Sequence, residues 1–512
     1  MLVKDTRRLV LFVLPTILLI GTAIRLYLNP EGLQKHNTNF APLQFAKDAG
    51  DDQDPLFSGE VIPDDPQTTP QEIPQDIPQE VPQEAPQEAP QEAPQEAPQE
   101  APQETLPETI PDTLPETPLD PIPTPEQHGN TQAGIMPTPE DLAATHQEVF
   151  SASTPDKKFF MIDFGSGFPA MNPNIIPHPT LDNTWIIVAQ WRLENKESQW
   201  FAELVCDATF QDNVLKCVNP PTTLTVAATT GGGRCEGDLA FFNTNIGPHD
   251  ARVFYGPEKP YTIFGSNSVH TCFGQFAQDL RMVVDWKSDR ENLEFRLGTE
   301  LQRPLPWNPV EKNWFLFWDS NGQMYAHYDV TPKRSFALIN GDGSVGPDLA
   351  PLSQESDERC MAKYFPKLGP ELESIHQATN SLQITTCNRN DPNCAPDDSN
   401  TFLFTIIQHK TYFSYHSVYE PYVMVFKQQA PFEIHAISRQ PIWIHGREKH
   451  PDKSTSDMFY LTSMSWKQRG QKYHGFLDDE LFLAFGIEDE KAAGINVLAG
   501  DLFKNLGACF EE

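Results

Sequence analysis

The sequence lacks several signatures of common enzyme classes. Cysteine is absent before residue 206, and no two of the eight cysteines form a Cys-x-x-Cys pair. This argues against a zinc ribbon and against a thioredoxin-like redox centre. The chain also contains no Gly-x-Ser-x-Gly and no His-Glu-x-x-His, the local signatures of α/β-hydrolase nucleophiles and of zinc proteases. Long runs with helical periodicity are scarce, which argues against a mainly helical fold.

Metal-ligand patterns are equally sparse. The one Asp-x-Asp motif, Asp52-Gln53-Asp54, lies in a proline-rich region outside any predicted fold. The sequence therefore predicts no metal site and no cofactor.

Positive charge is missing from one long stretch. Residues 51–127 contain 20 Asp and Glu and no Lys or Arg, so this stretch carries −20 of the net charge of −34 and leaves −14 for the rest. An acidic surface repels phosphate backbones, and we expect no nucleic-acid partner. The chain of 512 residues is long enough for a large folded domain beside this stretch.

One long hydrophobic run occurs, at Leu9–Leu28. As a helix it would span about 30 Å, the thickness of a bilayer core. Three basic residues lie within residues 1–8, so we expect this tail in the cytosol, residues 9–28 as a membrane anchor, and the remainder across the membrane. The alternative is a signal peptide cleaved after the small residues Gly21–Ala23. Under either interpretation the folded part enters the secretory pathway.

Residues 29–130 form an acidic, proline-rich spacer with Pro-Gln-Glu-Ala-like repeats over residues 66–104. Proline fixes φ and lacks an amide N–H, so a proline at every fourth position disfavours both helix and sheet. Polyproline II remains, and at about 3.1 Å per residue the repeats would reach on the order of 100 Å. We predict a disordered stalk. The lesser alternative is a ligand for a proline-recognising domain, since no basic residue flanks the prolines.

All eight cysteines lie after the spacer, and their even number fits disulfides formed in an oxidising compartment. Two pairs, Cys206/Cys217 and Cys387/Cys394, are close enough in sequence for local bridges. The pairing of Cys235, Cys272, Cys360 and Cys509 does not follow from the sequence. The alternative is a set of scattered buried thiols.

Residues 131–512 have the texture of a β-rich domain. Short apolar, β-branched and aromatic runs recur between Gly, Pro, Asn and Asp residues, which predicts strands. So many short strands favour a sandwich, barrel or propeller, and a propeller grows naturally by adding blades. We expect short helices at Glu371–Ala378 and Val497–Leu506. The predicted strands are Phe159–Phe164, Trp185–Trp191, Tyr261–Gly265, Met282–Trp286, Trp314–Trp318, Met324–Val330, Thr401–Gln408, Tyr422–Phe426, Phe432–Ile437, Met458–Trp466 and Leu481–Ile487.

Five polar motifs follow one another through this domain, each beside predicted strands. In order they are Met171–Ile176, Gly247–Phe254, Glu311–Trp314, Ile375–Ser381 and Tyr473–Glu480. The Asn-Pro, Asp-x-Arg, Lys-Asn, His and late Gly-x-x-Asp elements within them, over roughly residues 155–510, resemble the five-bladed β-propellers of the mannoside phosphorylases and the related β-1,2-mannosyltransferases. One motif departs from that pattern. The phosphorylases usually show Glu-Asp-Pro-Arg where this chain has His-Asp-Ala-Arg at residues 249–252.

The resemblance implies an all-β, five-bladed β-propeller over residues 131–512, with a substrate site on its axis. It assigns Asp250 as the catalytic carboxylate, with an Asx turn as the alternative. Arg252 would tune that carboxylate or hold phosphate, unless it forms a structural ion pair. The other candidates bind phosphate or sugar, or else shape turns and pack in the core. The phosphate candidates are Lys312, His327 and His376, and the sugar candidates are Asn172, Asn174, Asp478 and Asp479.

These observations predict a single-pass type II glycosyltransferase in a Golgi or other secretory-pathway membrane, with its domain in the lumen. Its partners would be a sugar-nucleotide or other phosphate-bearing donor of mannosyl units and a glycan acceptor, as in cell-wall assembly. Two alternatives remain open: a glycoside hydrolase or phosphorylase acting on mannosides, and a non-catalytic glycan-binding propeller. Secretion after signal cleavage is the alternative location.

Overall fold

The structure is a computed structural model. It describes residues 134–191, 202–229, 232–245, 247–284, 294–369, 373–413, 416–451 and 455–510. The predicted membrane anchor and stalk, residues 9–28 and 29–130, lie outside the described residues. Within the described ranges, no helix has both the length and the apolar character needed to cross a bilayer. Strands dominate this part of the chain, which confirms the expected all-β class.

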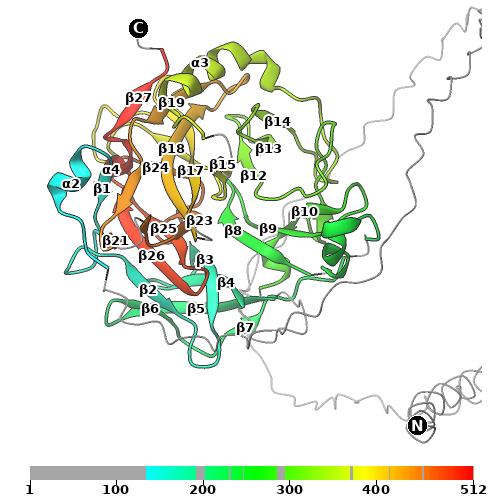
Figure 1. Cartoon of the computed structure of the whole chain (residues 1–512), viewed down its shortest axis with the longest axis horizontal. Helices are drawn as coiled ribbons and strands as arrows, with labels where there is room; N and C mark the ends of the chain where they lie inside the picture. Colours follow the sequence, from blue (N-terminus) through cyan, green and yellow to red (C-terminus); the bar gives the residue numbers. More distant parts are fainter. Residues whose placement is uncertain are drawn as a thin grey trace, which may run out of the picture. The chain divides into compact units, whose positions relative to one another are not determined.

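Successive antiparallel groups of strands surround a common centre (Figure 1). The first group runs outward through β3 (Ala170–Pro177), β4 (Trp185–Trp191), β5 (Glu203–Gln211) and β6 (Val214–Cys217), with β7 (Thr222–Thr223) paired to β5. The second group consists of β8 (His249–Tyr255), β9 (Pro260–Asn267), β10 (Phe273–Asp279) and β11 (Thr299–Glu300). The third consists of β12 (Phe315–Trp318), β13 (Met324–Asp329) and β14 (Ser335–Leu338).

Two further groups complete the circuit. In one, β15 (Ser374–Gln377) and β16 (Leu382–Thr385) both pair with β17 (Thr401–Phe413), followed outward by β18 (His416–Lys427), β19 (Ile434–Ser438) and β27 (Leu506–Ala508). The short β24 (His474–Phe476) runs parallel to β16. The last group consists of β23 (Phe459–Trp466), β25 (Glu480–Ile487) and β26 (Lys491–Leu498). We call β3, β8, β12, β15/β16 and β23 the innermost strands.

Strands from both ends of the domain close the circuit. The early strand β2 (Phe160–Asp163) pairs antiparallel with β26 and parallel with β6, which joins the first and last groups. At the other end of the chain, β27 adds an antiparallel edge to β19. Antiparallel groups arranged radially around a centre and closed by a strand from elsewhere make the fold β-propeller-like.

Short elements decorate the outside. Helix α2 (Pro139–Ala143) begins with a capping box between Thr138 and Asp141 and has proline at its first turn. β1 (Gln147–Val149) pairs with β20 (Ile442–Ile444), and β21 (Lys449–His450) pairs with β22 (Thr455–Ser456). The other helices within the described ranges are α3 (Gln354–Tyr364), α4 (Ala499–Phe503) and the 3-10 turns η2 (Gly237–Thr244), η3 (Leu280–Met282) and η4 (Ala350–Leu352).

Most predicted strands are present, but two local predictions are wrong. The helix predicted at Glu371–Ala378 is instead strand β15, because β17 supplies hydrogen-bond partners that override local propensity. The strand predicted from Met282 overlaps the end of η3. The helix predicted at Val497–Leu506 is confirmed over the five residues of α4.

The core lies between neighbouring groups. Strands β9 and β10 are buried at every residue, because each group packs against a neighbour on both faces. Between the third and fourth groups, Phe317 packs edge-on against Phe426 and Phe432, with ring centroids 5.4 and 5.1 Å apart. Such edge-to-face pairs add to the area that aromatic side chains bury.

All eight cysteines are paired. The two local bridges expected from sequence, Cys206–Cys217 and Cys387–Cys394, are confirmed. The other two are Cys235–Cys272 and Cys360–Cys509. Four disulfides indicate an oxidising lumenal or extracellular environment.

We expect the Cys360–Cys509 bridge to contribute most to stability, because its cysteines are 149 residues apart and it ties α3 to the chain end after β27. Replacing both cysteines with alanine should lower the free energy of unfolding by about 2–4 kcal/mol in chemical denaturation. The matched control removes Cys387–Cys394, whose separation is 7 residues, and should cost less. Equal losses in the two variants would contradict the prediction.

Candidate functional site

The innermost strands are irregular near their N-terminal ends. The pairing of β3 with β4 and of β8 with β9 each contains a register shift. At these bulges Asn172 and Asp250 have φ values of 54° and 51°, and Asn313, just before β12, has a φ of 62°. Asn and Asp tolerate this left-handed conformation better than most residues, and a bulge re-aims its side chain. The sequence thus places polar residues where the backbone turns them out of the ladder.

Side chains from the first group of strands replace hydrogen bonds that the β8 bulge loses. Glu203 Oε1 accepts the amide N–H of Ala251 at 3.1 Å. Asn174 Nδ2 donates to the carbonyl of Ala251, and its Oδ1 accepts the N–H of Val253, both at 3.0 Å. Because β-bulges leave backbone groups unpaired, these bonds fix the bulge that carries Asp250. Asn174, predicted to contact sugar, therefore braces backbone instead.

Arg252 braces the same bulge from within. Its Nη1 donates to the carbonyl of Asp250 at 3.1 Å, and its Nε donates to the carbonyl of Ala378 at 3.0 Å. Ala378 lies in the break between β15 and β16, so the guanidinium links two innermost strands across the centre. A further hydrogen bond joins Arg252 to Tyr460 of β23. The side chain is 5% exposed, which suits a positioning role.

Similar links continue around the centre. Asn380 exchanges two hydrogen bonds with the backbone of Met464 in β23, at 2.9 and 3.0 Å. The hydroxyl of Thr462 donates to the carbonyl of Pro173 in β3 at 2.6 Å. Buried polar side chains thus form hydrogen bonds to the backbone of neighbouring innermost strands. These bonds make the centre rigid.

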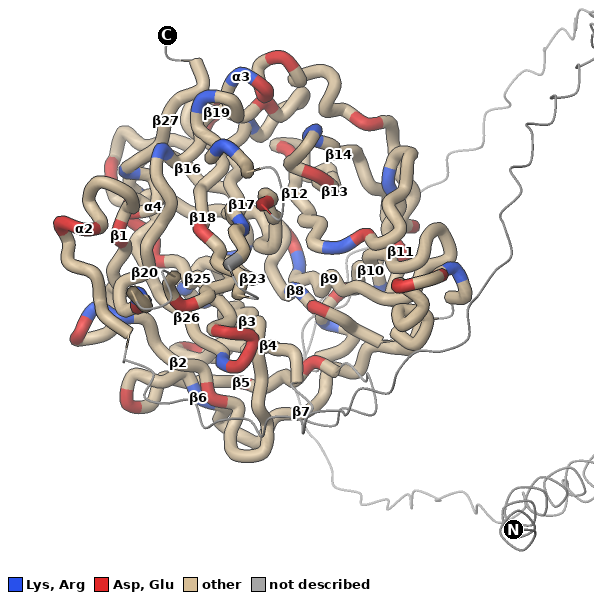
Figure 2. Tube along the Cα trace, in the orientation of Figure 1, with Lys and Arg blue, Asp and Glu red and all other residues tan. Residues whose placement is uncertain are grey.

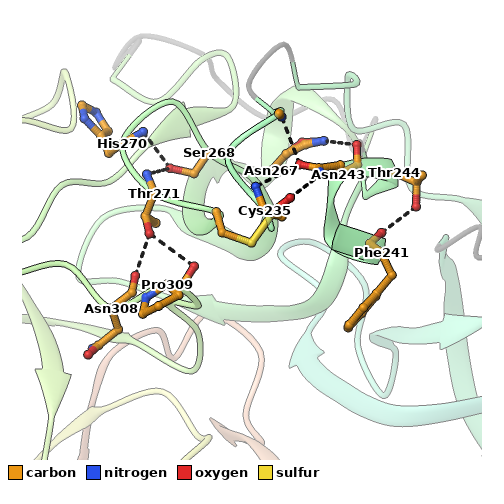
Figure 3. Close-up of a disulfide and its surroundings, with 12 residues drawn as sticks. Cys235, Phe241, Asn243, Thr244, Asn267, Ser268, His270, Thr271, Asn308 and Pro309 are labelled. Carbon is orange, nitrogen blue, oxygen red and sulfur yellow. Dashed lines mark hydrogen bonds between the residues drawn. A yellow bond between two sulfur atoms is a disulfide. The ribbon is translucent and has the colours of Figure 1, made fainter. Parts of the chain in front are cut away.

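The loop before Asp250 is fastened by the Cys235–Cys272 bridge (Figure 3). Asn243 Oδ1 accepts the N–H groups of Gly233 and Cys235, and Asn267 Nδ2 donates to the carbonyl of Asn243 at 3.0 Å. These contacts hold η2, the element that leads into β8.

Asp250 is an ionised carboxylate among cations. Its side chain is 23% exposed, and its Oδ2 lies 3.1 Å from Nε2 of His249. Burial opposes ionisation, but the hydrogen bond and charge of His249 and the charges of Arg252 and Lys312 hold the pKa of Asp250 well below its usual range. Asp250 is therefore ionised at neutral pH and can stabilise positive charge.

Two lysines lie close enough to His376 to affect its pKa. Lys312 is exposed just before β12, and Lys410 of β17 lies 5.8 Å from the ring centroid of Tyr419. Burial, together with the charges of Lys410 and Lys312, lowers the pKa of His376 to about 4. His376 is therefore neutral at pH 7, with its Nε2 2.9 Å from the hydroxyl of Ser374.

A second carboxyl, Asp489, was not among the sequence candidates. It lies exposed in the three-residue turn between β25 and β26, where Glu488 and Asp489 have φ values of 54° and 51°. Partial desolvation and the negative charges of Asp250 and Glu488 raise the pKa of Asp489. The Glu-Asp pair between two strands indicates a hairpin turn, which the sequence could have predicted. Nothing in the sequence shows that this turn approaches Asp250.

Glu203 is expected to make the stability of the fold around the site depend on pH. It is 1% exposed, and burial raises its pKa to about 8. A raised pKa means that the folded state holds the proton more tightly than the unfolded state, whose glutamate pKa is about 4.3. Stability from this group is complete below that value and falls by about 1.4 kcal/mol per pH unit as pH rises toward the folded pKa.

We therefore expect E203Q to remove this pH dependence, since glutamine still accepts from Ala251 but does not ionise. Urea unfolding of wild type from pH 5 to 9 should show declining stability, whereas E203Q should show a flatter profile. E355Q, at an exposed position of α3, should match wild type. An unchanged slope in E203Q would refute the assignment.

Two other candidates lie away from Asp250. Arg389 Nε donates to Asp479 Oδ1 at 2.9 Å, and the N–H of Arg389 donates to Asp478 Oδ1 at 2.6 Å. Both aspartates line a separate cavity of about 460 Å³. The structure does not bring them to the Asp250 cluster, because Gly475 and its neighbours follow β16 toward the opposite end of the innermost strands.

His327 is placed in the core. It is fully buried, its ring stacks on Phe315 with centroids 4.6 Å apart, and its Nε2 accepts from Arg334 Nε at 3.0 Å. Burial and the charge of Arg334 hold its pKa well below the usual range. A neutral, enclosed imidazole does not present a surface to phosphate, so the predicted role of His327 does not fit its position.

Asn172 remains beside the cluster. Its side chain is 8% exposed, and its Oδ1 has no hydrogen-bond partner among the described residues. A Cβ atom on Gly486 would come within 2.5 Å of that oxygen, so glycine at this position of β25 leaves room for the amide. Of the sequence candidates, Asn172, Asp250, Arg252, Lys312 and His376 lie near the N-terminal ends of the innermost strands.

No known protein family and no curated protein matches the sequence. Solved structures do match. β-1,2-Mannobiose phosphorylase from Listeria innocua is 12% identical with a TM-score of 0.36, covering 70% of this chain and 96% of its own. The catalytic domain of Coprinopsis cinerea GH62 α-L-arabinofuranosidase is 8% identical with a TM-score of 0.34, covering 69% and 98%. A thermostable family-43 glycoside hydrolase is 9% identical with a TM-score of 0.34, covering 67% and 91%.

All three of these structures have TM-scores below 0.5 against this chain. The propeller-like fold rests on the order of its strands, and the chemistry rests on the side chains around Asp250.

Proposed function

We propose that this protein is a five-bladed β-propeller enzyme that cleaves glycosidic bonds, with phosphate as the acceptor. The observation that carries the proposal is an ionised, partly exposed carboxylate, Asp250, set among the charges of His249, Arg252 and Lys312. One carboxylate beside several cations suits a reaction in which a sugar with developing positive charge meets an anionic phosphate.

The five-bladed interpretation is supported by the strand order. Each antiparallel group would be one blade, and β2 would supply the outermost strand of the last blade. Each innermost strand then contributes a polar side chain from its beginning. These are Asn172 from β3, Asp250 from β8, Lys312 before β12, His376 from β15 and Tyr460 from β23.

In this proposal each residue has a distinct role. Asp250 would stabilise the positive charge that develops at the anomeric carbon. Lys312 and Lys410 would hold phosphate for attack on that carbon, while the neutral His376 donates a hydrogen bond to it. Asp489, whose pKa is raised, would give its proton to the departing sugar oxygen as the glycosidic bond breaks.

Hydrolysis is the second candidate, favoured by the same pair of carboxyls. Their pKa values shift in opposite directions, which separates an ionised carboxylate from a proton donor, as in glycoside hydrolases. Water would then attack the anomeric carbon and lose its proton to solvent, while Asp250 stabilises the positive charge and Asp489 protonates the leaving oxygen.

The nucleotide-dependent transferase predicted from sequence gains no specific support from the described residues. The anchor at residues 9–28 and a Golgi location also stay predictions. The four disulfides are consistent with the lumenal placement that the anchor would give.

The test uses the full chain in mild detergent. In one assay it is incubated with mannosides and other glycosides, with and without phosphate. In a second assay it is incubated with sugar nucleotides and glycan acceptors. Release of a sugar 1-phosphate only when phosphate is present would support phosphorolysis. Phosphate-independent release of reducing sugar would select hydrolysis. Turnover only with a sugar nucleotide, or no turnover on any substrate, would overturn the proposal.

A further inference from the structure

We propose that the protein has a second site, which binds an oxyanion group attached to a sugar, at the ends of the innermost strands opposite Asp250. A cavity of about 530 Å³ lies there. Its charged lining consists of Arg389, Arg469 and Lys472, and its lining contains no aspartate or glutamate. Gln383, Gln468 and Gln471 supply neutral polar groups.

The cavity is separate from the proposed catalytic cluster. Asp250 lies at the start of β8, whereas Pro257, which lines the cavity, follows the end of the same strand. Seven residues of extended chain separate them, which corresponds to roughly 20 Å. A ligand of one or two sugar units could not reach both.

Arg389 is held in place by residues that do not line the cavity. Its Nε and Nη2 donate to the two carboxylate oxygens of Asp479, at 2.9 and 2.5 Å, and its guanidinium lies 4.4 Å from the ring centroid of Phe476. Nη1 has no hydrogen-bond partner among the described residues. Asp479 is 8% exposed and lines the adjacent cavity, so its carboxylate orients the guanidinium without facing the proposed ligand.

Arg469 and Lys472 are exposed, and each has fewer contacts than Arg389. Arg469 Nε lies 3.0 Å from Asp182 Oδ1, and its Nη1 donates to the carbonyl of Thr180 at 3.1 Å. Lys472 Nζ donates to the carbonyl of Glu258 at 2.5 Å and has no carboxylate partner among the described residues. Both arginines keep an unused nitrogen and the ammonium keeps unused protons. Donors oriented in advance by other contacts lose little entropy on binding an oxyanion.

The charge and size of the cavity indicate the class of ligand. Lys and Arg are interspersed with Asp and Glu along the folded domain (Figure 2), so a cavity whose lining includes Lys and Arg but no Asp or Glu differs locally from the acidic chain around it. Its volume falls in the range of sites for small ligands, roughly 300–1,000 Å³, and exceeds what a free inorganic ion needs. The amide side chains suit sugar hydroxyls. We therefore assign the site to a sugar bearing a phosphate ester, a sulfate ester or a carboxylate.

The experiment measures binding by calorimetry to the full chain carrying D250N, so that no turnover interferes. The probes are mannose 6-phosphate, glucose 6-sulfate, glucuronate and unsubstituted mannose, at fixed ionic strength. At least one anionic probe should bind, and unsubstituted mannose should bind at least about tenfold more weakly. Adding R469Q/K472Q should weaken the anionic probe by about tenfold or more.

A charge-matched control is R359Q/K367Q, whose residues lie on and after α3 and outside the cavity. It should bind as D250N alone does. The probe that binds identifies the source of the oxyanion. Equal binding by both double variants, or no preference for anionic over unsubstituted sugar, would overturn the proposal. Because binding is measured without catalysis, a failure of the glycoside-cleavage proposal leaves this result interpretable.

Discussion

Replacing Asp250 with asparagine should lower kcat/KM for glycoside cleavage by about 10³-fold or more. Asparagine matches aspartate in shape and accepts the left-handed φ of 51° found at this position, so the bulge should persist. It carries no negative charge to stabilise the sugar cation. The loss therefore reports chemistry rather than folding, and it should appear with whichever acceptor, phosphate or water, the assay identifies.

The control for D250N is D342N, an aspartate in an exposed turn between β14 and α3. Its activity should equal that of wild type, and urea unfolding should show both variants folded. The D489N variant should also lose activity, and more so for substrates with poor leaving groups, because it lacks the proton donor. If D250N retained wild-type turnover, Asp250 would not be the reacting carboxylate.

Replacing Arg334 with methionine should destabilise the fold by about 3–5 kcal/mol. Arg334 is 3% exposed, and its Nη1 donates to Asp357 Oδ2 at 2.9 Å and to the carbonyl of Phe432 at 2.6 Å. Its guanidinium also lies 4.5 Å from the ring centroid of Phe336. Methionine fills similar volume but leaves the buried carboxylate of Asp357 without its counter-charge. Equilibrium denaturation measures the loss.

The effect should depend on the partner. In R334M/D357N the uncompensated charge is removed, so the double variant should lose less stability than the sum of its two single variants. The matched control R359M breaks an ion pair with Glu355 whose side chains are 67% and 90% exposed, and should change stability little. Equal losses for R334M and R359M would show that burial does not govern this interaction.

The same contacts explain why His327 was a poor candidate site residue. From sequence it is one polar residue in the strand Met324–Val330, indistinguishable from a residue that faces a ligand. Only the neighbouring strands show that Phe315 and Arg334 enclose its ring. Strand alternation tells which residues share a face, but not whether that face meets solvent or another sheet.

The Asp250 cluster shows the converse. The sequence placed Asp250, Arg252, Lys312 and His376 in one ordered set of motifs, and the structure places all four near the beginnings of innermost strands. Their short motifs lie beside strands that the sequence pattern predicts. Glu203 and Asp489 were missed, because Glu203 comes from the third strand of its group and Asp489 from a hairpin turn, with no local signal of their approach to Asp250.

The all-β class, most strand positions and the two short-range disulfides could be predicted from the sequence, because side-chain periodicity and small sequence separations are local properties. The tertiary structure alone decided which polar residues meet. Bulges turn Asn172 and Asp250 out of their ladders, and bonds from Glu203 and Asn174 fix the bulge that carries Asp250. The opposite strand ends gather Arg389 and Lys472 around a different cavity. Such contacts join residues far apart in the chain, so their partners exist only once the sheets have closed.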